Sequence, residues 1–246
     1  MLEVQDLSKS YGETRALEGV SIAFEKGTIH AVLGENGSGK STLVKLLSGI
    51  VMPSRGRILV EGRTLGIFTP AAMQAAGLAT VFQEVLLAPD RTVTDNILLG
   101  SDGLLRRNIP RARRRDVAAE ALSRITATRI DLDAPAGDLP LAIRQLIVLA
   151  RAMARRPRLL ILDEITAALD FGDREAVFRT MERFAADGGL ILFISHRMDE
   201  VMRLAARISV LRNGRLVETL ARRDTSPAAL LRLMAPAAAE ELAYAV

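Results

Sequence analysis

The sequence predicts an α/β fold in which helices cover both faces of a parallel β-sheet. Strand-like and helix-like segments alternate along much of the chain. In addition, the segments Leu159–Leu162 and Leu190–Ile194 are apolar at every position. Strands of this kind are buried on both sides, because the connecting helices of a parallel sheet pack on both of its faces.

The individual elements follow from local patterns. Strands are expected at 16–24, 27–34, 57–61, 79–82, 159–162, 190–194 and 208–211, and helices at 41–49, 173–187 and 198–205. The stretch 91–156 is mostly helical by pattern. We therefore expect a single domain over 1–246. Its core would span 1–84 and 158–246 and include an N-terminal antiparallel β subdomain, and 85–157 would form an inserted α-helical subdomain.

Composition excludes several kinds of site. The chain has 246 residues, of which 49% are hydrophobic and 25% charged, as in globular proteins. It has no cysteine and only two histidines, which excludes thiolate chemistry and makes a histidine-built zinc centre improbable. No apolar run reaches the ~18 residues that span a bilayer, and the N-terminus does not resemble a signal peptide, so a cytosolic location is expected.

A glycine-rich segment between a predicted strand and a predicted helix carries the clearest chemical signal. Its sequence fits the pattern G-x-x-x-x-G-K-[ST], which is typical of the P-loop nucleotide-binding fold. Glycines let backbone N–H groups face phosphate oxygens, the lysine reaches the β- and γ-phosphates, and the hydroxyl binds Mg²⁺. The predicted ATP-binding residues of this loop are Gly34, Asn36, Gly37, Ser38, Gly39, Lys40, Ser41 and Thr42.

Two further segments follow buried strands. Asp163 and Glu164 come after Leu162, where Asp163 would hold Mg²⁺ and Glu164 would polarise the attacking water. Alternatively, the two acids cap the next helix. His196 follows the strand Leu190–Ile194 and would donate to the γ-phosphate, although a lone histidine there also suits a capping role.

With these motifs in this order, the chain resembles the ATP-binding cassette (ABC) ATPases over nearly its whole length. The segment Leu7–Gly12 is similar to the adenine-stacking loop of that family, with Tyr11 as the aromatic. Val81–Glu84 resembles the Q-loop, which implies that Gln83 senses Mg²⁺ or the lytic water. Ala167–Asp170 is similar to the D-loop, which places Asp170 at the dimer interface. The resemblance also makes Glu164 the catalytic glutamate and His196 the switch histidine.

Finer features resemble the carbohydrate-importer branch, notably 83–89, 95–100 and 195–201. The resemblance implies ATP and Mg²⁺ as cofactors and permease subunits in the membrane as partners. It also implies a second cassette, as homodimer or heterodimer, and an indirect link to a solute-binding protein. The chain would then lie on the cytoplasmic face of the inner or plasma membrane and energise the import of a sugar.

One segment departs from the resemblance. Where the family signature reads Leu-Ser-Gly-Gly-Gln, this chain has Leu139, Pro140, Leu141, Ala142 and Ile143. The signature normally contacts the ATP held by the opposite cassette. Pro140 has neither hydroxyl nor N–H, so one charge-assisted hydrogen bond of about 1.5–3 kcal/mol is lost. The N–H groups of Leu141 to Ile143 and the helix dipole still suit a phosphate.

Two other readings remain open. The altered signature is compatible with a catalytically weakened, regulatory nucleotide-binding subunit of a heterodimeric transporter. A second alternative is an ABC ATPase that acts on DNA or ribosomes, although no long coiled-coil insertion is present. The arginine-dense segment 106–115 lacks interleaved aromatics, so we interpret it as a solvated face and expect no nucleic-acid partner.

Overall fold

The computed structural model describes residues 2–101 and 108–235. A six-stranded sheet with the order β10-β9-β3-β8-β7-β6 forms its centre. All neighbouring strands in it are parallel except β10, which pairs with β9 in an antiparallel manner. The strands are β3 (Ile29–Leu33), β6 (Leu78–Val81), β7 (Leu159–Asp163), β8 (Leu190–Ile194), β9 (Arg207–Arg212) and β10 (Arg215–Ala221).

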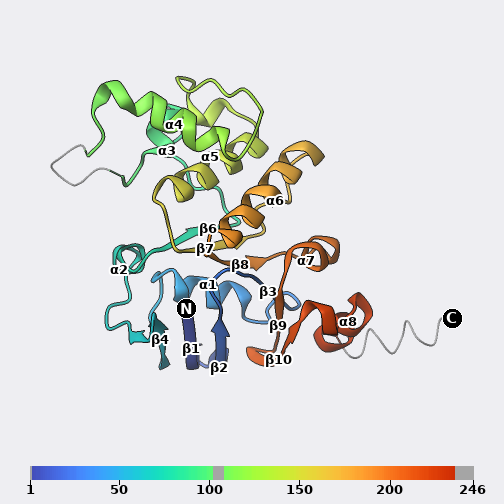
Figure 1. The fold of residues 1–246 in the computed structure, drawn as a ribbon. Coiled ribbons are helices and arrows are strands. Elements are labelled where there is room, and N and C mark those ends of the chain that lie inside the picture. Colours follow the sequence, from blue (N-terminus) through green and yellow to red (C-terminus); the bar gives the residue numbers. More distant parts are fainter. Residues whose placement is uncertain (1, 102–107, 236–246) are drawn as a thin grey trace.

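A smaller antiparallel sheet lies beside the first, on the side of helix α1 (Lys40–Leu47). Its order is β2-β1-β4-β5. The strands are β1 (Leu2–Tyr11), β2 (Thr14–Phe24), β4 (Arg55–Val60) and β5 (Arg63–Thr64). One apolar cluster joins α1, the inner face of this sheet and alternate residues of β7 and β8. The antiparallel sheet therefore covers one face of the large sheet with α1 between them (Figure 1).

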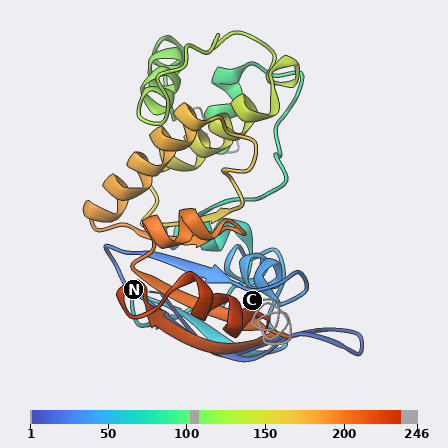
Figure 2. The ribbon, with the colours of Figure 1, turned by 90° about the vertical axis from the view of Figure 1, so that its right-hand side faces the viewer.

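Helices cover the opposite face. Helix α6 (Phe171–Ala186) packs against β3 and β8, and α7 (Met198–Leu204) and α8 (Pro227–Met234) follow β8 and β10. Helices α3 (Val93–Ile97), α4 (Arg114–Ser123) and α5 (Leu141–Ala154) pack on one another and gather at one end of the molecule (Figure 2). The second apolar cluster runs without interruption from these helices to the sheet, so the packing is continuous across the expected boundary.

The fold class is confirmed, and most predicted elements lie within two residues of their observed bounds. The helix α2 (Pro70–Ala75), strands β1, β5 and β10, and helix α8 were not predicted. In one respect the prediction was wrong: Leu7–Tyr11 is the second half of β1, paired with β2, and only the turn at Gly12 is a loop. The division at 84/85 and 157/158 stays a prediction.

The middle of the chain is less regular than its sequence pattern predicts. Beyond α3, α4 and α5, the described residues 91–101 and 108–156 contain two short 3₁₀ helices (Arg111–Arg113 and Ala136–Asp138) and connecting loops. Arg111 and Arg113 are exposed and Arg115 pairs with Asp133, as a solvated face requires. Arg106 and Arg107, like the alanine-rich tail from 236, lie outside the described residues. None of the helices in the described part is long and apolar enough to cross a bilayer.

Candidate functional site

The sheet order brings four loops to one edge of the large sheet. Strands β3, β8, β7 and β6 are consecutive and parallel, so the loops that follow them leave the sheet on the same side. In the register, Asp163 pairs with Ile194, which brings Glu164 next to the segment that contains His196. Ligands bind at this edge in open α/β sheets, as the sequence analysis expected.

The glycine-rich loop after β3 is locked into shape by close packing. Gly34 has φ +155° and Gly39 has φ +105°, which side chains rarely tolerate. A Cβ at Gly34 would lie 2.3 Å from the carbonyl oxygen of Leu211, and one at Gly39 would lie 2.7 Å from Leu17 Cδ2. Glycine is therefore required at these two positions, both by the backbone conformation of the loop and by the close packing around it.

Helix α1 begins at Lys40 and has no side chain that caps its N-terminus. Its first N–H groups therefore remain available to an anion, and the helix dipole adds to the attraction. Lys40 Nζ donates to the carbonyl oxygens of Gly34 at 2.7 Å and Glu35 at 2.9 Å. Burial lowers the pKa of Lys40, with Glu164 and Asp163 opposing that shift.

Two adjacent carboxylates lie opposite this helix end. Burial, reinforced by the charge of Glu164, raises the pKa of Asp163 to about 6, and Lys40 only partly offsets this. Glu164 follows with a left-handed backbone of φ +50°. Non-glycine residues in this conformation carry about 1–3 kcal/mol of strain, and such strain collects at functional sites. Neither acid caps the next helix, because Asp170 fills that role in α6.

Glu164 is the meeting point of the side chains that follow the other strands. Its Oε2 accepts a hydrogen bond from Gln83 Nε2 at 3.0 Å and lies 3.5 Å from His196 Nδ1. These residues and the start of α1 line one cavity of about 730 Å³. The predicted site residues in its wall are Tyr11, Asn36, Gly37, Gly39, Lys40, Ser41, Thr42, Gln83, Asp163, Glu164 and His196.

Tyr11 ends β1 and contributes the aromatic at the rim of this cavity. Its side chain is 46% exposed, and Lys9 Nζ lies 5.1 Å from the ring centroid. Thr14, Arg15 and Ala16, from the start of β2, complete that wall and were not predicted. A cavity of about 390 Å³ at the opposite edge of the sheet contains none of the predicted residues.

The structure keeps a second group of predicted residues away from the cavity. Leu139, Pro140, Leu141 and Ala142 lie at the start of α5, and Asp170 lies at the start of α6; none of them lines the cavity. Pro140 occupies the N-cap position and no side chain caps α5. Leu141 is 55% exposed. Residues that serve a nucleotide on a partner chain would lie apart in this way.

Sequence reasoning missed the residues behind the site. Glu200 in α7 is buried, and its carboxylate accepts hydrogen bonds from Thr166 and Ser195, which flank the predicted catalytic side chains. The available signal was weak: a charged residue four positions after His196, on a helix that otherwise buries apolar residues.

Comparison with known proteins agrees with this geometry. The profile of a family described as ABC transporter matches residues 17–167, more than half of the chain. The chain belongs to the ABC transporter family. The match covers the glycine-rich loop, Gln83, the signature segment and the Asp163-Glu164 pair.

Curated relatives come from the same family. The chain is 47% identical over 219 residues to a ribose import ATP-binding protein (RbsA 1) of Rhizobium johnstonii, a match that covers 89% of this chain and 43% of the relative. A protein of the same name from Mesorhizobium japonicum is 42% identical over 234 residues, which covers 95% of this chain and 45% of the relative. The chain thus spans less than half the length of the curated relatives it matches.

Solved structures share the fold. A dimeric ATP-binding cassette, MJ0796, in a post-hydrolysis state bound to ADP and Pi, superposes with a TM-score of 0.82 at 23% identity and covers 91% of this chain and 99% of its own. The ATP-binding cassette MJ1267 gives a TM-score of 0.81 at 26% identity, with 99% and 98% coverage. These likenesses confirm the α/β nucleotide-binding fold.

Proposed function

We propose that this chain is the ATP-binding and ATP-hydrolysing subunit of an ABC importer whose solute is a sugar. The cavity at the sheet edge supports this most directly, because it unites an uncapped helix N-terminus, Lys40, two carboxylates, Gln83 and His196. The names of the ribose import relatives support a sugar as the solute.

Each residue has a distinct role on ATP. The loop Gly34–Gly39 and the N-terminus of α1 hold the β- and γ-phosphates, and Lys40 leaves its carbonyl partners to neutralise them. Glu164 accepts a proton from, and orients, the water that attacks the γ-phosphorus in line. Gln83 fixes the Glu164 carboxylate through its hydrogen bond, and His196 donates to the γ-phosphate as charge develops. Tyr11 stacks on the base.

Ser41, Gln83 and Asp163 would hold Mg²⁺. They offer a hydroxyl, an amide and a carboxylate oxygen in the wall of one cavity, which is the donor set that Mg²⁺ accepts beside phosphates. The raised pKa of Asp163 fits as well, since a nearby cation would compensate its buried charge. When bound, Mg²⁺ would supply positive charge that offsets the negative charge of the phosphates.

A second cassette completes the site in this proposal. The start of α5 (Leu139 to Ala142) and Asp170 do not line the chain's own cavity and would contact the ATP of the partner. The uncapped N–H groups of α5 replace the missing signature hydroxyl in part. Homodimer and heterodimer both satisfy this geometry.

A groove between the core and the helices supports docking of a permease. Two small adjacent cavities of about 190 and 150 Å³ share Ala79, Thr80, Phe82 and Arg155 in their walls. The exposed apolar side chains Ile50 and Leu86 also line them. A helix of the membrane subunit would pack here, which would hold the chain at the cytoplasmic face of the membrane. A solute-binding protein would act only through the permease.

Calorimetry and turnover test the proposal together. Wild-type chain is expected to bind ATP in a Mg²⁺-dependent manner. Glu164→Gln should retain that binding and lower turnover at least about 100-fold, because the group that orients water is lost. Glu120→Gln, at an exposed position on α4, is the control and should match wild type. Equal turnover in Glu164→Gln and wild type would refute hydrolysis at this site.

A further inference from the structure

A buried carboxylate stands directly behind the two loops that carry the candidate catalytic residues. Glu200 lies in the first turn of α7 and is 1% exposed. It does not line the cavity, so it has no contact with a nucleotide there. An acidic side chain this deeply buried is expensive unless its environment compensates it.

The compensation comes from the catalytic loops themselves. Glu200 Oε2 accepts a hydrogen bond from Thr166 Oγ1 at 2.7 Å and another from Ser195 Oγ at 2.9 Å. Thr166 is two residues after Glu164, and Ser195 immediately precedes His196. One carboxylate oxygen therefore joins the loop after β7 to the loop after β8.

A positive charge lies near the second carboxylate oxygen of Glu200, to which no described group donates a hydrogen bond. Arg197 Nε lies 3.4 Å from Glu200 Oε1, and the backbone N–H of Arg197 donates to Ser195 Oγ at 3.1 Å. The Ser195 hydroxyl thus accepts a hydrogen bond from the backbone of Arg197 and donates one to Glu200. Residues on both sides of His196 are fixed by the same carboxylate, while Thr166 fixes the chain after Glu164.

We infer that Glu200 is a positioning residue that sets the separation of Glu164 and His196 by clamping their two loops. The inference rests on the function proposed above for those residues. The clamp explains how two side chains on separate loops are held 3.5 Å apart, even though Glu164 has a strained backbone and the His196 side chain is largely exposed.

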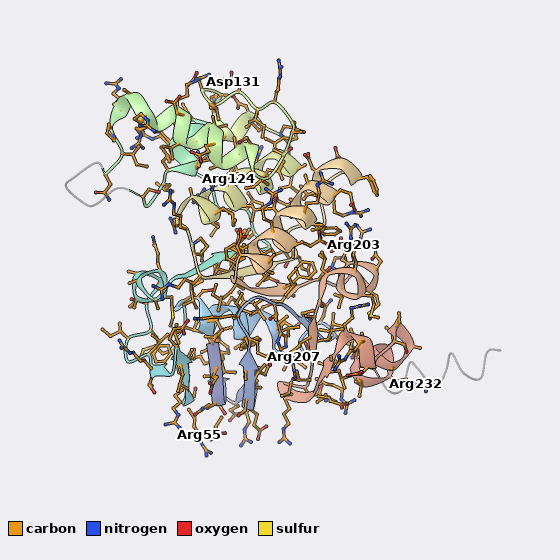
Figure 3. The ribbon with its side chains drawn as sticks, viewed as in Figure 1. Arg55, Arg124, Asp131, Arg203, Arg207 and Arg232 are labelled. Atoms are coloured by element: carbon orange, nitrogen blue, oxygen red, sulfur yellow. The ribbon has the colours of Figure 1, made fainter. Side chains whose placement is uncertain are left out.

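Glu200→Gln is the test variant. It keeps the size of the side chain but removes the negative charge. Its amide nitrogen cannot accept a hydrogen bond from a hydroxyl group and cannot form an ion pair with Arg197. Thr166→Val, which removes one donor and leaves the carboxylate, should give a smaller change of the same kind. The matched control is Glu175→Gln. It breaks the ion pair with Arg203, also on α7, without touching either loop (Figure 3 labels Arg203).

Binding is measured on the full chain, and turnover on the dimer that the full chain forms with its second cassette. Glu200→Gln should lower kcat about tenfold, while the Kd for Mg·ATP from calorimetry stays within about twofold of wild type, because Lys40 and the glycine-rich loop are untouched. Glu175→Gln should match wild type in both. Equal losses of affinity, melting temperature and kcat in Glu200→Gln would show a merely structural role and overturn the inference.

The second readout needs no nucleotide. The chain has only two histidines, so the imidazole region of its NMR spectrum holds two sets of signals, and His196→Gln identifies which set belongs to His196. At fixed pH, Glu200→Gln should shift and broaden the His196 signals and leave those of His30 in place. Unmoved His196 signals would overturn the clamp. A wild-type chain that fails to bind ATP would instead refute the proposed function.

Discussion

Helices α1 and α5 both begin without a side-chain cap, and they differ in what surrounds that end. Helix α1 starts after Gly39, whose left-handed backbone (φ +105°, ψ −2°) no other residue adopts easily. Helix α5 starts after Pro140, in an extended conformation (φ −56°, ψ +153°) that many residues adopt. Both ends expose N–H groups and the positive end of a dipole.

The surroundings decide what each end does. The start of α1 lies in a cavity with Lys40 and Asp163, where burial strengthens every interaction with a phosphate. The start of α5 is exposed at Leu141 and has no charged side chain in its first turn apart from Arg144, which donates to Leu139 O. The first is a preformed cavity, whereas the second would become a site only in the proposed dimer, where a partner covers it.

The largest effect is expected from Gly39→Ala. The new Cβ would meet Leu17 Cδ2 at 2.7 Å and Ala16 O at 2.8 Å, in a backbone region that disfavours alanine. The loop must then shift, and we expect the Kd for Mg·ATP to rise by about 100-fold or more, or about 3 kcal/mol. Calorimetry measures this.

Gly62→Ala is the control for backbone strain alone. Gly62 also has a left-handed backbone (φ +74°) but has open space around it and lies outside the cavity. It should lose some stability and bind ATP like wild type. If both variants bind equally well, the shape of the glycine-rich loop does not determine affinity.

An effect of intermediate size, a gain in turnover, is expected from a substitution at the start of helix α5. Pro140→Ser restores a hydroxyl and an N–H at the N-cap of α5, where serine is favoured. If that hydroxyl contacts the ATP of the partner, turnover by the assembled dimer should rise about tenfold, with unchanged ATP affinity of the isolated chain. Leu141→Ser is the control, because it adds a hydroxyl one position too late. A Pro140→Ser chain no faster than wild type would mean that backbone groups suffice here.

The two helix ends also show what sequence can predict. Most of the predicted loop residues line the cavity at the start of α1, because they are contiguous in 34–42 and the motif fixes their geometry. Strand β1 was missed because a bulge with Asp6 at φ +50° changes the spacing of its buried residues from Leu2 and Val4 to Leu7, which breaks the alternation.

Contacts between segments far apart in the sequence could not be predicted, for a different reason. The resemblance assigned roles to Gln83 and His196, but no sequence pattern states that both would lie beside Glu164. Glu200 is an ordinary helix-start acid by sequence, and only its burial against Thr166 and Ser195 reveals a role. Such pairings depend on the sheet order, which places β7 next to β8.

The smallest effect is expected on the free energy of unfolding, because the cavity at α1 buries the charge of Asp163 before any ligand binds. Burial raises the pKa of Asp163 to about 6 from its ordinary 3.8, so its ionisation destabilises the fold as pH rises through that interval. Asp163→Asn removes this penalty. Without nucleotide, the variant should be more stable than wild type at pH 7.5 by about 1–2 kcal/mol, since partial solvent exposure reduces the full value, and equally stable near pH 4. Thermal unfolding at both pH values measures the difference.

With saturating Mg·ATP the order of stability of the two proteins should reverse, because only wild type retains the carboxylate for Mg²⁺. A variant less stable than wild type at pH 7.5 without ligand would show that the buried charge is already compensated within the chain, as it is at Glu200.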